Sequence, residues 1–292
     1  MKSQMEYYSF NRYLRNRFGC KVYKISINGG FTCPNRDGTC GTRGCIFCSA
    51  GGSGDFAEDP RLSVTQQIEK GKARVQNKIK SGKYIAYFQA FTNTYAPVEV
   101  LRKKFTEAIE HPDIVMLSVA TRPDCLPDDV IDLLAQLNTI KPVSVELGLQ
   151  TIHQKSADYI RRGYNLACFD DAVCRLKKAG LEVVCHIILG LPGESKSDML
   201  QSVDYACKSG INGIKLQLLH VLKNTDLEKE YRAGKFKTLT FEEYLDIIKS
   251  CVKIIPKEIV IHRLTGDGAK KDLIAPLWSA DKKKVLNAIS KL

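Results

Sequence analysis

Short apolar stretches alternate with longer amphipathic stretches through the middle of the chain. The short stretches are rich in Val, Ile and Leu and suit strands, whereas the longer ones repeat apolar residues with the period of a helix. Their order predicts an α/β fold with a parallel sheet covered by helices, as an open sheet or a partial (β/α)6 barrel. The predicted strands span 22–27, 84–89, 114–119, 143–150, 182–190 and 214–219, and the predicted helices span 63–80, 97–110, 127–138, 167–179 and 197–209.

The predicted strand 143–150 has a polar face as well as an apolar one. Its apolar residues alternate with Ser144, Glu146, Gly148 and Gln150, and a strand turns the two sets to opposite sides. The apolar set should face the helices. Because an inward Glu146 would be costly in a packed barrel unless it were paired, the polar set predicts a site that this strand lines.

The alternation weakens after the last of these strands. A charged stretch is followed by a predicted helix at 241–254, for which Thr240 is the expected N-cap and Glu243 its capping-box partner. A further strand is predicted at 259–262, and a basic helix is expected to end the chain. We therefore expect one α/β domain, 1–220, with a carboxy-terminal extension, 221–292, packed on it.

The sequence carries a formal net charge of +12, which favours polyanionic partners such as RNA or DNA. The alternative is a generally basic surface without a dedicated partner. Lys70, Arg74 and Lys78 recur at four-residue spacing and would form one basic stripe on a helix. Other basic clusters comprise Arg12, Arg15 and Arg17, then Lys270 and Lys271, and finally Lys282 to Lys284.

Hydropathy and cysteine usage favour a protein of the reducing cytoplasm. No stretch approaches 18 consecutive apolar residues, so no membrane span is predicted, and the first residues lack the apolar core of a secretory signal. The chain has 11 cysteines, an odd number. In a reducing compartment, clustered thiols bind metal more often than they form disulfides.

Four of the cysteines, Cys33, Cys40, Cys45 and Cys48, fall in one loop of Gly, Thr, Asn and Asp directly after the first predicted strand. Such a loop has little apolar surface to bury, so the thiols point to a metal site. A zinc ribbon would need a second close cysteine pair, and the remaining cysteines are scattered. The loop therefore favours an iron–sulfur cluster, with zinc or a redox-active pair as the alternatives.

The loop ends in a Cys-X-aromatic-Cys turn around Phe47. Together with the strand–helix series it resembles the loop of radical S-adenosylmethionine (SAM) enzymes. The long gap between Cys33 and Cys45 is typical of the Elp3-like branch and of the bacterial YhcC/YtqA-type proteins. Three further stretches occur in the same order in Elp3-like enzymes, namely Glu146–Thr151, Tyr159–Gly163 and His186–Glu194.

The resemblance implies a [4Fe–4S] cluster held by Cys33, Cys45 and Cys48, with one iron free for the amino and carboxylate groups of SAM. Cys40 as a fourth ligand would close that position, so we expect it to be a free surface thiol. The other implied cofactor-binding residues are Phe47, Gln89 near the methionyl amine, Glu146 or Gln150 for the ribose hydroxyls, Arg162 for the carboxylate, His186, and the turn from Gly190 to Gly193 for the adenine.

Each of these residues also has a structural interpretation. Glu146 could be a buried acid paired with a base, and Gln89 and Gln150 could be core amides. Arg162 could lie on a helix surface, and His186 could equally be a core histidine. The two glycines could form an ordinary strand-to-helix turn.

The resemblance also implies a reaction. Reductive cleavage of SAM gives methionine and a 5′-deoxyadenosyl radical, which takes a hydrogen atom from an inert carbon. Elp3-like enzymes act on C5 of the tRNA wobble uridine, and the implied step here converts a carboxymethylaminomethyl group to an aminomethyl group. The expected partners are tRNA and a flavodoxin- or ferredoxin-type electron donor. The alternatives are a radical enzyme for a protein or small metabolite, and a non-catalytic zinc module that binds nucleic acid.

Overall fold

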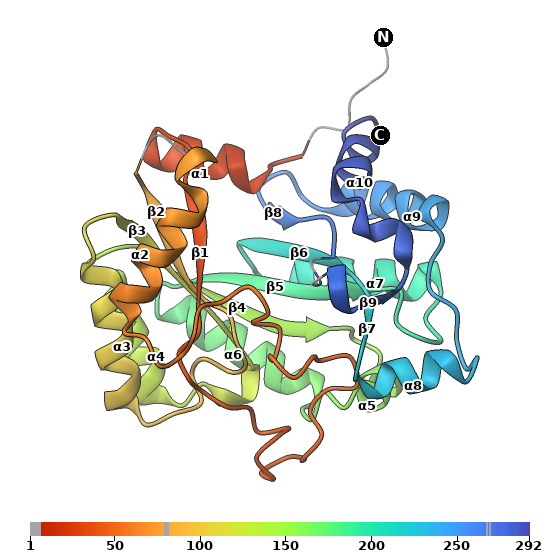
Figure 1. Cartoon of the computed structure of the whole chain (residues 1–292), viewed down its shortest axis with the longest axis horizontal. Coiled ribbons are helices and arrows are strands. Elements are labelled where there is room, and N and C mark those ends of the chain that lie inside the picture. The colour runs from red at the N-terminus through yellow and green to blue at the C-terminus, as the bar shows by residue number, and fades with distance from the viewer. Residues whose placement is uncertain (1–6, 79–81, 267, 269) are drawn as a thin grey trace.

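A curled sheet of seven parallel strands forms the centre of the molecule (Figure 1). The computed structural model describes residues 7–78, 82–266, 268 and 270–292. The strand order is β1-β2-β3-β4-β5-β6-β8, so strands that follow one another in the chain are also neighbours in the sheet. These strands are β1 (Tyr23–Ile27), β2 (Tyr84–Phe88), β3 (Ile114–Thr121), β4 (Val143–Gln150), β5 (Glu182–Leu189), β6 (Gly213–Leu218) and β8 (Val260–Arg263).

Helices connect the strands and cover the convex face of the sheet (Figure 1). The apolar stripes of most helices pack on the strands in one large core that holds Phe105 and Phe169, whereas Leu14 of α1 and Leu227 of α8 belong to two smaller clusters. The predicted α/β fold and partial barrel are therefore confirmed. The helices are α1 (Phe10–Phe18), α2 (Val64–Val75), α3 (Val98–Glu110), α4 (Asp128–Asn138), α5 (Gln154–Tyr159), α6 (Leu166–Lys178), α7 (Lys196–Lys208), α8 (Asp226–Arg232), α9 (Phe241–Ile254) and α10 (Lys282–Ile289).

Strand β4 has the two faces that its sequence predicts. Its apolar residues lie in the main core against the helices. Glu146, Gly148 and Gln150 line a cavity on the concave face, and Ser144 donates a hydrogen bond to Ser118 on the neighbouring strand at 3.1 Å. The period of two therefore separates the packing face of the sheet from the face that carries chemistry.

The carboxy-terminal residues contribute one strand to the barrel. Strand β8 pairs in parallel with β6, so the sheet has one strand more than the six of the predicted barrel. The amide of Ile261 donates to the carbonyl of Tyr8 at 2.8 Å, which brings the chain before α1 to the outer edge of β8. A two-stranded antiparallel sheet of β7 (Val221–Leu222) and β9 (Leu273–Ala275) lies outside the barrel.

The helix at 241–254 has the predicted bounds and the predicted cap. The amide of Glu243 donates to Thr240 Oγ1 at 3.2 Å, and the amide of Thr240 donates to Glu243 Oε2 at 2.8 Å. The other predicted helices agree with the structure to within one residue at each end, except the first. Helix α2 ends at Val75 and continues as a 3-10 turn at 76–78, and residues 79 and 80 of the prediction lie outside the described residues.

The basic clusters lie in different parts of the molecule. Arg12 and Arg15 are exposed on α1, and α10 carries Lys282 to Lys284. Both helices lie at the top of Figure 1, whereas the orange-red loop that carries the clustered cysteines lies at the bottom. Lys70 and Arg74 are exposed on α2, where Arg74 pairs with Glu58, and the side chain of Lys78 lies outside what the structure describes. Across the described ranges, no helix is long and apolar enough for a membrane span.

Candidate functional site

A cavity opens on the concave face of the barrel, at the carboxyl ends of the strands. Its empty volume is about 1070 Å³ with the open mouth included, which suits a ligand the size of a nucleoside cofactor. Of the residues predicted from sequence, it brings together Cys33, Cys45, Phe47, Cys48, Gln89, Glu146, Gln150, Arg162 and His186. Gly190 and Gly193 are not among the described residues that line it.

The cysteine loop is held in place by bonds to other parts of the barrel. The side-chain amide of Asn35 donates to the carbonyl of Arg161 at 2.7 Å, and the amide of Ile46 donates to the carbonyl of Ile160 at 3.2 Å. On its other side, Ile46 accepts a hydrogen bond from the amide of Leu227 in α8 at 3.0 Å. A loop without regular structure thereby acquires a fixed shape, as a site for a cluster requires.

Three thiols of the loop share the cavity mouth, and the fourth does not. Cys33, Cys45 and Cys48 line the cavity, whereas Cys40 is exposed and lies outside the cavity lining. A hydrogen bond from Cys48 lowers the pKa of Cys45 to about 6 against the opposing effect of burial, and Asn35 adds a hydrogen bond to Cys45 Sγ at 3.4 Å. The same hydrogen bond raises the pKa of Cys48. The three thiols line one cavity, so these three residues could hold a cluster.

Two polar atoms of residues that line the same cavity as the thiols are buried without a hydrogen-bond partner in the described structure, Gln150 Oε1 and Arg162 Nη2. The rest of the Arg162 guanidinium donates to backbone carbonyls, among them that of Thr151 at 2.7 Å. Gln150 has a φ of 68°, which is uncommon for a residue other than glycine and aims its side chain back over Gly148. Unpartnered buried polar groups that line a cavity indicate a polar ligand.

The predicted residues differ in whether their polar atoms are still free to form hydrogen bonds with a ligand. Gln89 accepts from Ser26 Oγ at 3.0 Å and donates to the carbonyl of Ser53 at 2.7 Å, which fixes its amide at the cavity wall. Both carboxylate oxygens of Glu146 accept bonds from protein donors. Of the two residues expected at the ribose, Gln150 is therefore the one with a free acceptor.

Glu146 is the centre of a buried polar cluster at the base of the cavity. Its Oε1 accepts from Lys24 Nζ at 2.5 Å and from Ser118 Oγ at 2.9 Å. Its Oε2 accepts from His186 Nε2 at 2.8 Å and from Lys215 Nζ. Burial would raise the pKa of Glu146, but the charges of Lys215 and Lys24 hold that pKa well below its usual range.

His186 is a neutral member of this cluster. The side-chain amide of Gln217 donates to His186 Nδ1 at 3.1 Å, which leaves the ring proton on Nε2 for Glu146. Burial and the charge of Lys215 lower the pKa of His186 to about 4. The histidine therefore lines the cavity without carrying charge at neutral pH.

Sequence reasoning missed several residues of the site. Lys215 and Gln217 alternate with apolar residues in β6, as Glu146 and Gln150 do in β4, so the same period of two could have found them. Arg122, which donates to the carbonyl of Arg162 at 2.9 Å, follows a strand without any such pattern. Its place is set by the fold alone.

The two predicted glycines form the turn between β5 and α7. Gly190 has a φ of 89° and Gly193 a φ of 84°, which glycine adopts without strain. A Cβ at position 190 would lie 2.9 Å from the side chain of Leu239, so this glycine also permits close packing by the chain before α9. Their proposed role at the adenine remains a prediction.

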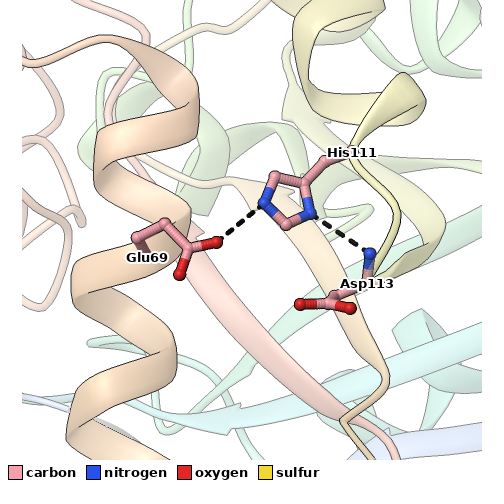
Figure 2. A group of neighbouring side chains, drawn as sticks. All are labelled: Glu69, His111 and Asp113. Atoms are coloured by element: carbon pink, nitrogen blue, oxygen red, sulfur yellow. Dashed lines mark hydrogen bonds and ion pairs between the residues drawn. The ribbon is translucent and has the colours of Figure 1, made fainter.

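A second group of polar side chains lies outside the cavity, between α2 and the end of α3 (Figure 2). Glu69 Oε1 lies 2.9 Å from His111 Nε2, and His111 Nδ1 accepts from the amide of Asp113 at 3.2 Å. The ammonium of Lys72 pairs with both carboxylates, at 2.8 Å from Glu69 and 2.5 Å from Asp113. Because Lys72 already supplies the positive charge, the group is best read as a clamp between helices.

A thiol-lined cavity at the carboxyl ends of parallel barrel strands defines a cofactor-dependent βα-barrel enzyme. The Radical SAM superfamily model matches residues 36–206, and the model of the Radical_SAM C-terminal domain matches residues 211–292. The chain therefore belongs to the radical SAM superfamily and is a radical SAM enzyme. Its cofactors are those of the superfamily, a [4Fe–4S] cluster and SAM, and the family assignment removes the zinc-module alternative.

Individual relatives agree with the predicted branch. The chain is 47% identical over 289 residues to "Uncharacterized protein YtqA" of Bacillus subtilis, covering 99% of this chain and 90% of that protein. It is 29% identical over 168 residues to a "tRNA uridine(34) acetyltransferase" of Methanocaldococcus jannaschii, covering 56% of this chain and 30% of that protein. The structure of Elp3 from Methanocaldococcus infernus has the same fold, with a TM-score of 0.64 and 18% identity, covering 90% of this chain and 63% of that one.

The residues present fit the cofactors of the superfamily. Three thiols at the mouth match a cluster that leaves one iron open, and the exposed Cys40 leaves that position free. The unpartnered Gln150 Oε1 and Arg162 Nη2 are an acceptor and a charged donor of the kind that the hydroxyl and carboxylate groups of SAM require.

Proposed function

We propose that this protein modifies the wobble uridine of tRNA. It converts a carboxymethylaminomethyl group at C5 of that base to an aminomethyl group, in the cytoplasm, with electrons from a flavodoxin- or ferredoxin-type donor. Loss of a hydrogen atom and then of one electron from the methylene beside the carboxylate would give an imine, and hydrolysis of its C–N bond would release the two-carbon unit as glyoxylate. When bound, the cluster and SAM supply a radical: reductive cleavage of SAM gives a radical that takes a hydrogen atom from a carbon of the substrate. The observation that carries the proposal is the cavity in which three thiols meet two unpartnered polar atoms, in a chain related to a tRNA uridine(34) acetyltransferase.

The chain's own residues have three tasks in this proposal. Cys33, Cys45 and Cys48 hold the cluster, and the bonds of Asn35 keep the loop in shape. Gln150 binds the ribose hydroxyls of SAM through its free acceptor, and Arg162 Nη2 binds the carboxylate. Gln89, Phe47 and the glycine turn contribute the remaining contacts to the methionyl amine and the adenine.

The charge of the chain, the nature of RNA loops and one relative support RNA as the substrate. The net charge of +12 favours a polyanion. Single-stranded nucleotides of an RNA loop can also be turned out of their stack and inserted into a cavity, as an anticodon loop allows. The relative whose printed name includes tRNA uridine matches over 56% of this chain.

The test is anaerobic reconstitution of the cluster, followed by SAM, reductant and tRNA from a strain that lacks the gene for this protein. We expect 5′-deoxyadenosine to form and carboxymethylaminomethyluridine in the digested tRNA to decrease as aminomethyluridine increases. Arg162→Lys serves as the matched variant, because lysine keeps the charge but cannot reproduce the planar set of donors. It should retain iron and lose most SAM binding. Formation of 5′-deoxyadenosine that tRNA does not stimulate, with unchanged nucleosides, would favour a protein or metabolite substrate.

A further inference from the structure

The base of the cavity holds more positive than negative charge. Lys24 and Lys215 both bind Glu146, so two ammonium groups share one carboxylate. Among the described residues that line the cavity, Glu146 is the one with an acidic side chain. A single carboxylate between two lysines leaves the base of the cavity able to accept a second anion beside Lys215.

The cations at the cavity mouth differ from those at its base. The charges of Arg122 and Arg36 act on the Cys45 thiolate, and Arg122 also pairs with Asp124 at 2.6 Å. The mouth therefore has negative groups of its own. Lys215 lies deeper, since it is three residues before the end of β6, or about 10 Å along the strand.

Lys215 has a donor to spare. Its ammonium donates to Glu146 Oε2 and to Tyr87 Oη at 3.1 Å, and the described residues provide no acceptor for its third proton. The side chain is 4% exposed and lines the cavity, so a group that enters can reach it. A second lysine on the same carboxylate, Lys24, is not among the described lining residues of this cavity. It lines a hollow beside α1, to which Lys215 also contributes.

We propose that Lys215 binds the carboxylate at the end of the substrate side chain. The inference rests on the proposed function and deepens it, because it states how the enzyme selects a carboxymethylaminomethyl group. The carboxylate brings a second negative charge to the base of the cavity. The aminomethyl product has lost that carboxylate, so it leaves a site that repels its ammonium group.

The test compares two pairs of probes on the reconstituted enzyme with SAM bound. One pair is the nucleoside 5-carboxymethylaminomethyluridine and its neutral carboxamide, and the other is the fragment N-methylglycine and its amide. Calorimetry gives the affinity of each. A charge-assisted hydrogen bond in a buried site predicts a preference for the carboxylate of about tenfold or more in each pair.

Three variants test whether Lys215 causes the preference for the carboxylate. Lys215→Met keeps the length of the side chain and removes its charge, so the preference should fall to about twofold or less. Lys215→Arg should retain most of it. Lys24→Met is the matched control, because it removes a lysine from the same Glu146 and should keep the preference for the carboxylate. Urea unfolding of each variant shows whether a loss reflects folding.

The outcomes separate the inference from the proposed function. Equal affinity of the wild-type enzyme for carboxylate and amide overturns the inference, even if Lys215→Met does not fold. A preference that Lys215→Met retains also overturns it. If the fragments show a preference that depends on Lys215 while tRNA is not modified, the carboxylate site stands and the tRNA proposal fails. If tRNA is modified but no preference is measured, the tRNA proposal stands and the carboxylate site fails.

Discussion

At the scale of single residues, the cysteines of one loop are expected to behave differently. Cys40 is exposed, whereas Cys45 lines the cavity beside Cys48. Cys40→Ser should therefore keep both the iron content and SAM cleavage, and Cys45→Ser should abolish both, because a thiolate is lost from a three-ligand site. Iron and sulfide analysis after reconstitution measures the first property, and 5′-deoxyadenosine the second.

One result of these cysteine substitutions would contradict the predicted ligand set. If Cys40→Ser loses its iron while Cys33→Ser keeps it, the ligand set is wrong and the loop must rearrange on metal binding. Thermal unfolding of the metal-free variants serves as the control. A serine that only disturbs folding would lower the melting temperature before any cluster is added.

His186 predicts a specific dependence of stability on pH. The pKa of this histidine is lowered from 6.5 to about 4 by burial and by Lys215, so the unfolded chain binds the proton at higher pH than the folded chain does. Stability then falls as pH drops below 6.5 and levels off below 4. Between pH 7.5 and 5, this one group should cost about 2 kcal/mol.

The variant His186→Gln tests this pH dependence, since its amide keeps a donor for Glu146 but does not titrate. The free energy of unfolding from urea titration at pH 7.5 and pH 5 should decline less in the variant than in the wild type. Parallel declines in the two proteins would mean that the histidine is charged in the folded state. The other histidines are present in both proteins, so their contribution to the pH dependence of stability cancels in this comparison.

At the scale of elements, the start of helix α9 offers a local test. Thr240 and Glu243 form reciprocal side-chain to backbone bonds at its first turn. Thr240→Ala removes the acceptor of the Glu243 amide and should lower the free energy of unfolding by about 1 kcal/mol. Thr238→Ala is the matched control, because Thr238 precedes the helix and the N-cap is Thr240. Equal losses in the two variants would contradict the role of the capping box.

Local patterns predict elements well where the element's own residues decide the structure. The capping box fixed the start of α9, and the alternation in β4 fixed which side chains enter the barrel. The same reasoning missed α8, since its charged sequence gives little sign of the face that lies against the cysteine loop. It also left β8 outside the predicted barrel, because pairing with β6 depends on residues far away in the chain.

The candidate site shows the same division. The cysteines, Glu146 and Gln150 were found because their residue types and spacing carry chemistry by themselves. The partners of Glu146 were not, since Lys24 precedes it by 122 residues and Lys215 follows it by 69. Only the curling of the sheet brings residues of β1, β4 and β6 together, so their pairing is a property of the fold.

At the scale of the whole molecule, the direction of the barrel decides which basic residues can meet a polyanion. Arg43 lies in the cysteine loop beside Gly44, which lines the cavity; its side chain is 71% exposed and lies 3.6 Å from Asp226. The clusters on α1 and α10 lie at the other end of Figure 1. The net charge of +12 is therefore a sum over separate surfaces, and only part of it can act on an RNA that enters the cavity.

Binding of tRNA should therefore depend strongly on salt, with a contribution from the mouth and none from α1. About five phosphate contacts would weaken binding roughly 80-fold between 0.1 M and 0.3 M salt, because each contact releases counterions. Arg43→Ala should reduce the slope of log affinity against log salt by about one unit, whereas Arg12→Ala on α1 should leave it unchanged. Filter binding over a salt series measures both. A reduced slope in Arg12→Ala with a normal slope in Arg43→Ala would place the RNA on the opposite end of the barrel, away from the thiols, and would contradict entry of the anticodon loop through the mouth.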